Sequence, residues 1–161
     1  MTAPLDDIVV IEIDNWMASP SAGAVLADLG ARVIKVEPLS GDPMRNMSRP
    51  IKNPQISDAI KSLDLQFDVD NRGKESVAVA LDQPEGAALV RRLVEKADIF
   101  MCNLLINRQA KFGLDPATLL QVNPKLVHAT LTGYGTTGPD AGRPGYDVTA
   151  FFGRSGLYDA Q

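Results

Sequence analysis

The first 37 residues read as a strand, a helix and a second strand in close succession, and this pattern constrains the fold more than any other. Residues 8–13 form a β-branched apolar run, which is typical of a buried strand. Ser19 and Pro20 predict a helix start, with Ser19 as the N-cap, and Gly30 predicts its end. Residues 33–37 supply the next strand. A β-α-β unit this short implies a parallel strand pair with a right-handed crossover.

The same alternation resumes after a long loop. Residues 38–72 are rich in proline and lack a sustained period, so we expect a surface excursion with a short helix over residues 57–65. Asp82 is expected to cap the next helix, with Pro84 at its start and an apolar stripe of Leu89, Val90, Leu93 and Val94. The remaining elements are expected as strands over residues 76–81, 98–102 and 126–132, and as helices over residues 107–112 and 116–122, the latter capped by Asp115.

Strands that alternate with helices in this way predict an α/β protein with a three-layer α/β/α arrangement and a mostly parallel sheet. A chain of 161 residues has room for one domain with a proper hydrophobic core. Ligands of such sheets usually bind at the carboxyl ends of the strands, where the loops gather.

Composition excludes several classes of function. The formal charge of −4 comes from 20 acidic and 16 basic residues spread along the chain, which argues against nucleic acid as a partner. A single cysteine, Cys102, cannot form an internal disulfide, and no Cys/His cluster has zinc-ligand spacing, so no metal is expected. Residues 1–20 lack a signal-peptide pattern and no apolar run is long enough to span a membrane, so we expect a cytoplasmic protein.

One motif invites a misleading interpretation. Residues 133–138 fit the G-x-G-x-x-G pattern and follow an expected strand. The dinucleotide-binding version of this motif must open a helix, whereas Pro139, Gly142, Pro144 and Gly145 follow here. A nicotinamide site is therefore not expected.

Three further side chains have structural explanations that we favour over chemical ones. His128 and Cys102 lie inside apolar strands, where an imidazole packs and a thiol behaves as a small hydrophobe. Ser19 is better explained by helix capping than by catalysis, because no nucleophile elbow surrounds it.

An ordered set of local motifs is more specific than any one of them. The set comprises residues 18–38, 41–45, 71–76, 81–86, 97–98, 133–139 and 143–147. Together these motifs resemble the class III CoA transferases, which include formyl-CoA and carnitine CoA transferases and the related α-methylacyl-CoA racemases. The resemblance runs from about Leu5 to Gln161. It implies a Rossmann-like α/β domain that binds coenzyme A as a substrate.

The resemblance also implies which residues would surround CoA, although simple packing at strand ends remains the alternative for most of them. Met17 and Ala18 would face the thioester and pantetheine end. Val79, Ala80, Leu81 and Asp82 would line the adenine or pantetheine, and Asn103, Leu104 and Leu105 the nucleotide side. Lys111 would bind phosphate, and Pro144, Gly145, Tyr146 and Asp147 would close the pocket.

Several positions depart from the family pattern. Residues 102–107 replace a Glu-Asn-Phe-Arg-Pro-Gly-like stretch of the family, so the phosphate-binding contacts or the shape of this loop are expected to differ. Met17 stands where formyl-CoA transferases have glutamine, and Pro38 where a basic residue is frequent. Tyr146 occupies the position of a proton-transferring histidine in the racemases, and a phenol with a pKa of about 10 is a poor base at neutral pH. A transferase is therefore favoured over a racemase.

The mechanism implied by the resemblance passes CoA between an acyl-CoA donor and a small carboxylic acid through aspartyl anhydride and aspartyl thioester intermediates. The nucleophilic aspartate is expected beyond Gln161, with Asp147 in a supporting role and Asp159 a weaker candidate.

Residues 1–161 would then be the amino-terminal portion of the large CoA-binding domain, with an incomplete sheet and without the small domain and the returning carboxyl-terminal segment. We expect the chain to be inactive alone and to form a homodimer or to need the missing portion. A racemase-like enzyme and a non-catalytic CoA-binding or assembly module remain the alternatives.

Overall fold

The computed structural model describes residues 3–47 and 64–158. Its five strands form one sheet in the order β3-β2-β1-β4-β5, and all four pairings are parallel. The strands are β1 (Val9–Ile13), β2 (Arg32–Glu37), β3 (Glu75–Ala78), β4 (Ile99–Cys102) and β5 (Val127–Thr130). The expected α/β class with a parallel sheet is confirmed.

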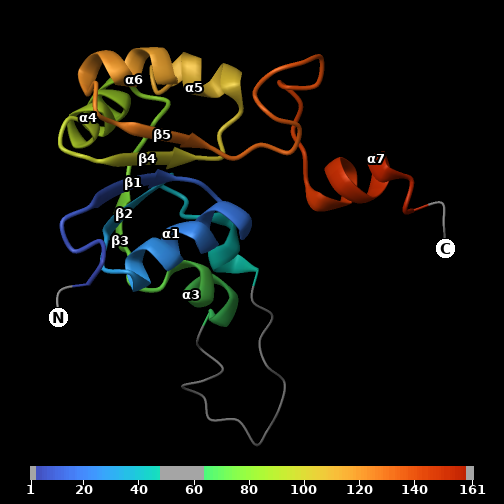
Figure 1. Cartoon of the computed structure of the whole chain (residues 1–161), viewed down its shortest axis with the longest axis horizontal. Helices are drawn as coiled ribbons and strands as arrows, with labels where there is room; N and C mark the ends of the chain where they lie inside the picture. The colour runs from blue at the N-terminus through green and yellow to red at the C-terminus, as the bar shows by residue number, and fades with distance from the viewer. Residues whose placement is uncertain (1–2, 48–63, 159–161) are drawn as a thin grey trace, which may run out of the picture.

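Helices cover both faces of the sheet, so the fold has three layers (Figure 1). One face carries α1 (Ala18–Asp28) and α3 (Leu65–Asn71), and the other carries α4 (Pro84–Val94), α5 (Ile106–Phe112) and α6 (Pro116–Val122). Strand residues alternate between the two cores: Val10 and Val33 pack toward α1, whereas Ile11 and Phe100 pack toward α4, α5 and α6. All four of these side chains are buried.

The starts of α1 and α4 differ from the expected ones. Met17 is the N-cap of α1, and Ser19 lies inside the helix with its hydroxyl donating to the buried carboxylate of Asp14. The N-cap prediction for Ser19 is therefore wrong, because a carboxylate at the end of β1 takes the hydroxyl that a cap would use. Gln83, not Asp82, is the N-cap of α4, although Pro84 does open that helix.

The predicted cap of α6 and the predicted end of α1 are confirmed, and the predicted apolar stripe of α4 is confirmed in part. Asp115 caps α6 by accepting from the backbone N–H of Thr118. Gly30 follows the C-cap of α1 with a φ of 101°, a conformation that glycine adopts without strain. In the stripe of α4, Val90 and Val94 are buried but Leu89 is exposed, and Ala87 is buried instead.

Between β2 and β3 the described residues hold a short 3₁₀ turn, η1 (Pro43–Asn46), and helix α3. The helix expected over residues 57–65 falls almost entirely outside the described residues. Side-chain carboxylates cap both described elements: Asp42 accepts from the N–H of Met44, and Asp64 from that of Phe67.

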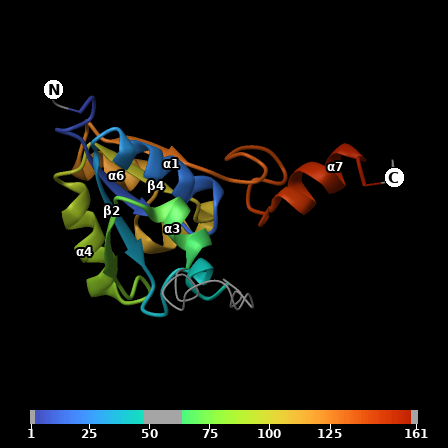
Figure 2. The same ribbon diagram turned by 90° about the horizontal axis from the view of Figure 1, so that it is seen from below.

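Beyond β5 the chain leaves the body of the domain. No helix opens on residues 133–138, as expected for a G-x-G-x-x-G match that is not a nucleotide motif. A π-helical turn, η2 (Asp147–Phe152), and α7 (Gly153–Ser155) then project away from the sheet (Figures 1 and 2). We call residues 147–158 the arm. Across the described part of the chain, no helix has the length and apolar character needed to cross a membrane.

Candidate functional site

A cleft of about 540 Å³ lies at the carboxyl ends of the strands. It sits beside the point where β1 and β4 are neighbours and the chain leaves them toward opposite faces of the sheet, the place where α/β proteins usually bind ligands. Its lining residues come from four strand ends and from α5: Ile13, Asn15, Val36, Pro38, Leu39, Ser40, Val79, Ala80, Leu81, Asp82, Leu104, Arg108 and Phe112.

The cleft combines an apolar floor with a few polar groups. Ile13, Val36 and Val79 are buried beneath it, which gives a flat aromatic or aliphatic ligand a surface to pack on. Arg108 is the cation among the lining residues, and its guanidinium carbon lies 6.0 Å from the ring centre of Phe112. An apolar cleft with one exposed guanidinium suits a ligand with both a ring system and an anionic group.

Asn103 joins the ends of β1 and β4 behind the cleft. Its side-chain amide donates to the carbonyl of Asn15 at 2.7 Å and accepts from the N–H of Asn15 at 3.2 Å. Both polar ends of the amide are thereby used, so Asn103 fixes the position of Asn15 in the cleft wall.

Trp16, the next residue, has a φ of 69° and is the one non-glycine residue with a positive φ among those described. A bulky side chain in the left-handed region costs about 1–2 kcal/mol and is seldom retained without a reason. Its indole makes a T-shaped contact with Tyr146 at 6.0 Å between ring centres. The adjacent Met17 is half exposed, and its sulfur accepts from the side-chain amide of Gln66.

A buried ionic cluster lies directly under this turn. The ammonium of Lys35 is 3.1 Å from Glu12 Oε1 and 3.0 Å from Asp42 Oδ2, and it donates to the backbone carbonyl of Asp14 at 2.8 Å. Lys74 reaches Glu12 from the other side at 2.8 Å. Asp14 Oδ1 lies 3.6 Å from the ammonium of Lys35, so the cluster places three carboxyl groups against two ammonium groups.

Burial in the cluster favours the protonated form of Asp14. Burial, and next the neighbouring charge of Glu12, raise the pKa of Asp14 from 3.8 to about 8. For Lys35, burial favours the neutral amine, but the charge of Glu12 and then the interactions with Asp14 and Asp42 outweigh it and raise the pKa. A pKa of about 8 favours protonated Asp14 at neutral pH, which leaves the carboxylates of Glu12 and Asp42 beside Lys35 and Lys74. Burial in turn lowers the pKa of Lys74.

Glu37 anchors the loop that follows β2, and residues of this loop line the cleft. Its carboxylate accepts from Arg45, from Ser76 at 2.6 Å and from the backbone N–H of Asp42 at 2.9 Å. Burial opposes ionisation, but hydrogen bonds from Arg45 and then Ser76 prevail and lower the pKa of Glu37 to about 2. Arg45 also stacks on Phe67, at 3.8 Å from its ring centre, so α3 is tied to the same loop.

The cleft brings together part of the expected site. Val79, Ala80, Leu81, Asp82 and Leu104 line it. The other expected residues do not belong to its lining: Met17, Ala18, Asn103, Leu105, Lys111, Pro144, Gly145, Tyr146 and Asp147. Of these, Tyr146 is nonetheless linked to the β1 end through Trp16.

Sequence reasoning missed Arg108 and Asn15. Arg108 lies one helical turn before Lys111 on α5, so a search for every cation on that helix would have found it. Lys111 is exposed, with its ammonium 5.8 Å from the ring centre of Phe112. Asn15 follows the first expected strand, and its place at a strand's carboxyl end is the signal that could have found it.

His128 and Cys102 have the structural roles expected of them. The ring of His128 packs on Phe100, and its Nε2 is 3.1 Å from the carbonyl oxygen of Leu114. Cys102 is buried, and burial raises the pKa of its thiol to about 11, which leaves it unreactive at neutral pH.

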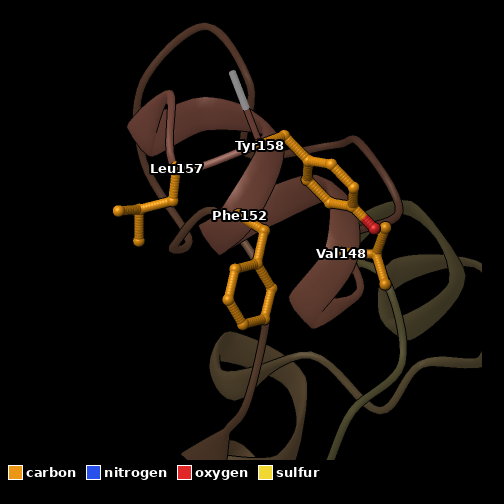
Figure 3. A pocket seen from close by; sticks show the side chains of 4 residues that line it. All are labelled: Val148, Phe152, Leu157 and Tyr158. Atoms are coloured by element: carbon orange, nitrogen blue, oxygen red, sulfur yellow. The ribbon is translucent and has the colours of Figure 1, made fainter. Parts of the chain in front are cut away.

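A second, smaller hollow of about 220 Å³ lies on the arm. Val148, Phe152, Leu157 and Tyr158 line it (Figure 3). All four side chains are exposed, and no charged side chain is among them. This hollow has the character of a packing surface rather than of a polar ligand site.

The described geometry has a counterpart in a known family. The family model for CoA-transferase family III matches residues 5–161. The chain belongs to this family. This confirms the resemblance drawn from the ordered motifs, and relatives from two bacteria illustrate the family's range.

One family member, succinate–glutarate CoA-transferase of Agrobacterium fabrum, is 42% identical over 98% of the chain. Another, cinnamoyl-CoA:phenyllactate CoA-transferase of Clostridium sporogenes, is 39% identical over 93% of the chain. The chain spans 40% and 35% of their respective lengths. A crystal structure of a CaiB/BaiF family protein from Brucella suis superposes with a TM-score of 0.84 at 39% identity, over 99% of this chain and 41% of that one.

Proposed function

We propose that the cleft binds the nucleotide portion of coenzyme A, and that the chain is the amino-terminal portion of the large CoA-binding domain of a CoA transferase. The observation that carries this proposal is the apolar cleft beside the β1–β4 switch point with Arg108 on its wall. Membership of CoA-transferase family III supports the choice of ligand.

The chemistry of the lining residues suits the parts of CoA. The adenine ring would pack on the apolar floor formed by Ile13, Val36 and Val79. The guanidinium of Arg108 would pair with phosphate oxygens. Asp82 would accept from a ribose hydroxyl or the adenine amino group, because a carboxylate repels phosphate.

The transfer itself would proceed as the resemblance implies. An aspartate carboxylate attacks the acyl-CoA carbonyl, which releases the CoA thiolate and leaves a mixed anhydride. The thiolate then attacks the aspartyl carbonyl, which releases the donor acid and leaves an aspartyl thioester. The acceptor carboxylate attacks this thioester, which releases the CoA thiolate and leaves a second mixed anhydride. The thiolate then attacks the acceptor's carbonyl carbon, which forms the new acyl-CoA and frees the aspartate carboxylate. We place the nucleophile in sequence that follows the arm, with Asp147 in support.

The donor acyl group and the acceptor acid differ widely among relatives. One of those above is named for the dicarboxylic acids succinate and glutarate, the other for aromatic cinnamoyl and phenyllactate groups. We extend to this chain only the common class, an acyl-CoA and a small carboxylic acid, and propose that it works in the cytoplasm as a homodimer or with a completing portion.

Calorimetric titration with CoA tests the proposal. Saturable binding is expected, and Arg108→Ala should weaken it about tenfold through loss of a charge-assisted phosphate contact. Lys111→Ala is the matched variant, because it removes an equal charge from the same helix at a side chain outside the cleft lining. We expect it to weaken binding by less than about threefold, the size of an exposed charge pair.

The reverse order of effects would move the phosphate contact to Lys111, and no binding at millimolar CoA would contradict the proposal.

Two assays separate a CoA transferase from the alternative functions. Exchange of an acyl-CoA α-proton with D₂O would indicate a racemase-like enzyme. CoA binding in the full-length protein without acid-dependent CoA exchange would indicate a binding module.

A further inference from the structure

The strained turn at Trp16 directly follows Asn15, which lines the cleft. Asn15 lines the cleft and is held on both its backbone polar groups by Asn103, so the direction in which Trp16 leaves the cleft wall is fixed. The positive φ of Trp16 turns its indole toward Tyr146, a residue 130 positions later in the chain. The fold thus uses an unfavourable backbone conformation to place one large aromatic side chain beside the cleft.

The surface formed there is apolar. Trp16 is 37% exposed, Met17 50% and Tyr146 56%, so each has surface available to a ligand. Exposed aromatic and methionine side chains that gather at the edge of a ligand cleft usually contact an apolar part of the ligand.

Lys35 beneath the turn, and the two arginines on the segment that carries Tyr146, already have carboxylate partners. Asp14 and Lys35 are buried beneath the turn. Asp14 accepts a hydrogen bond from Ser19, and Lys35 pairs with Asp42. Arg143 and Arg154, on the segment that carries Tyr146, both pair with Asp140. A carboxylate at the end of a bound acyl chain would therefore find an apolar wall here and no vacant cation among these residues.

We propose that Trp16, Met17 and Tyr146 form a subsite that selects an apolar acyl group, aromatic or branched, over one that ends in a carboxylate. This inference rests on the proposed CoA site, because it takes the thioester arm to run from the cleft past Asn15. Trp16 is its central specificity residue, since it contacts Tyr146 and follows Asn15 directly.

Trp16 is the single tryptophan of the chain, so its fluorescence reports on this place alone. The probes are CoA and two unreactive thioethers, S-(2-phenylethyl)-CoA and S-(3-carboxypropyl)-CoA. We expect the phenylethyl thioether to bind about tenfold or more tightly than CoA, since each buried methylene adds about 0.8 kcal/mol. It should also shift the Trp16 emission to shorter wavelength, whereas the carboxypropyl thioether should bind no more tightly than CoA.

Variants measured by calorimetry then locate the effect. Trp16→Gly should fold, because glycine accepts the positive φ, and should bring the ratio of CoA to phenylethyl-CoA dissociation constants close to one. Trp16→Phe should keep most of the ratio. Leu120→Ala, an exposed apolar residue on α6, is the control and should keep all of it.

Each outcome bears on a separate claim. CoA binding with equal affinity for the three probes would overturn the subsite and leave the proposed function in place. A preference that persists in Trp16→Gly would also overturn the subsite. No binding of any probe would overturn the proposed function, and the subsite with it.

Discussion

Asp14 lies one residue before the cleft, buried against Ser19 and the ionic cluster. Its pKa of about 8 in the folded chain, against 3.8 for an ordinary aspartate, means that folding takes up a proton between these two values. An acid whose pKa is raised by folding contributes stability below its unfolded pKa and loses that contribution as the pH rises through the folded pKa. The contribution of Asp14 to the free energy of unfolding should therefore fall as the pH rises from about 4 to 8.

Asp14→Asn removes this titrating group and should flatten the dependence. We expect the fall in unfolding free energy between pH 5 and pH 8 to be smaller in the variant, by a slope that corresponds to about one proton. Urea denaturation at pH 5, 6, 7 and 8 measures it, and groups common to both proteins cancel in the difference. Asp68→Asn, on the exposed side of α3, should keep the wild-type slope. Equal slopes in the wild type and Asp14→Asn would contradict the prediction.

Single residues in the sequence predicted local features such as helix caps well, but they did not predict interactions between residues far apart in the chain. Asp115 and Pro84 were predicted correctly as a cap and a helix start, because each depends on the next few residues alone. Ser19 was predicted as a cap, but its partner is a carboxylate at a strand end. The cluster joins Glu12 to Lys74, which is 62 residues away, so no local pattern could reveal it.

At the scale of elements, the approach of α4 to the end of β3 depends on Gly86. A Cβ at Gly86 would lie 2.0 Å from the carbonyl oxygen of Ala80, which belongs to the cleft wall. No side chain larger than hydrogen fits there without a shift of helix or wall.

Gly86→Ala should therefore destabilise the fold, although alanine is favoured over glycine inside a helix by about 1 kcal/mol. We expect a net loss of roughly 1–3 kcal/mol from overpacking, together with weaker CoA binding. Glu85→Ala, an exposed change at the preceding position, should stay within about 0.5 kcal/mol. Both are measured by urea denaturation. A more stable Gly86→Ala would show that the wall moves freely.

Most element types could be predicted from the sequence, and the ends of elements less so. The strand expected over residues 76–81 ends at Ala78, although the N–H of Val79 still donates to Glu37, and Leu81 then turns into the cleft wall. The strand expected over residues 126–132 is likewise shorter, Val127–Thr130. In both cases the apolar pattern extends past the strand: Leu81 lies in the cleft wall, and Leu131 is 45% exposed.

At the scale of the whole molecule, apolar side chains gather on surfaces away from the cleft. Phe151 is 58% exposed and Tyr158 60% on the arm, and Val127 is 59% exposed on the outer strand β5. Surfaces of this kind usually mark an interface.

We expect the chain to self-associate at micromolar concentration, with the arm in the contact. Phe151→Glu should weaken association by at least about tenfold, since it removes a buried aromatic contact and introduces a charge. Gln121→Glu, on the exposed side of α6, adds the same charge elsewhere and should have little effect. Sedimentation velocity over a concentration series measures both, and a monodisperse monomer throughout would contradict the prediction.

The overall class followed from the order of elements, but the strand order β3-β2-β1-β4-β5 and the arm did not. Strand order depends on which distant strands pair, and the pairing of β1 with β4 joins residues almost 90 positions apart. The projecting arm depends on residues 147–158 finding no place on the body, which a local pattern does not encode.

The pairing of β1 with β4 is also a seam between two halves of the sheet. The cleft crosses it: Val36, Ser40 and Val79 stand on one side, and Leu104 and Arg108 on the other. A ligand that fills the cleft would contact both halves of the sheet across this seam. It would oppose their separation by the free energy that it gains from contacting both halves. A bound ligand would then stabilise the domain as well as occupy its cleft.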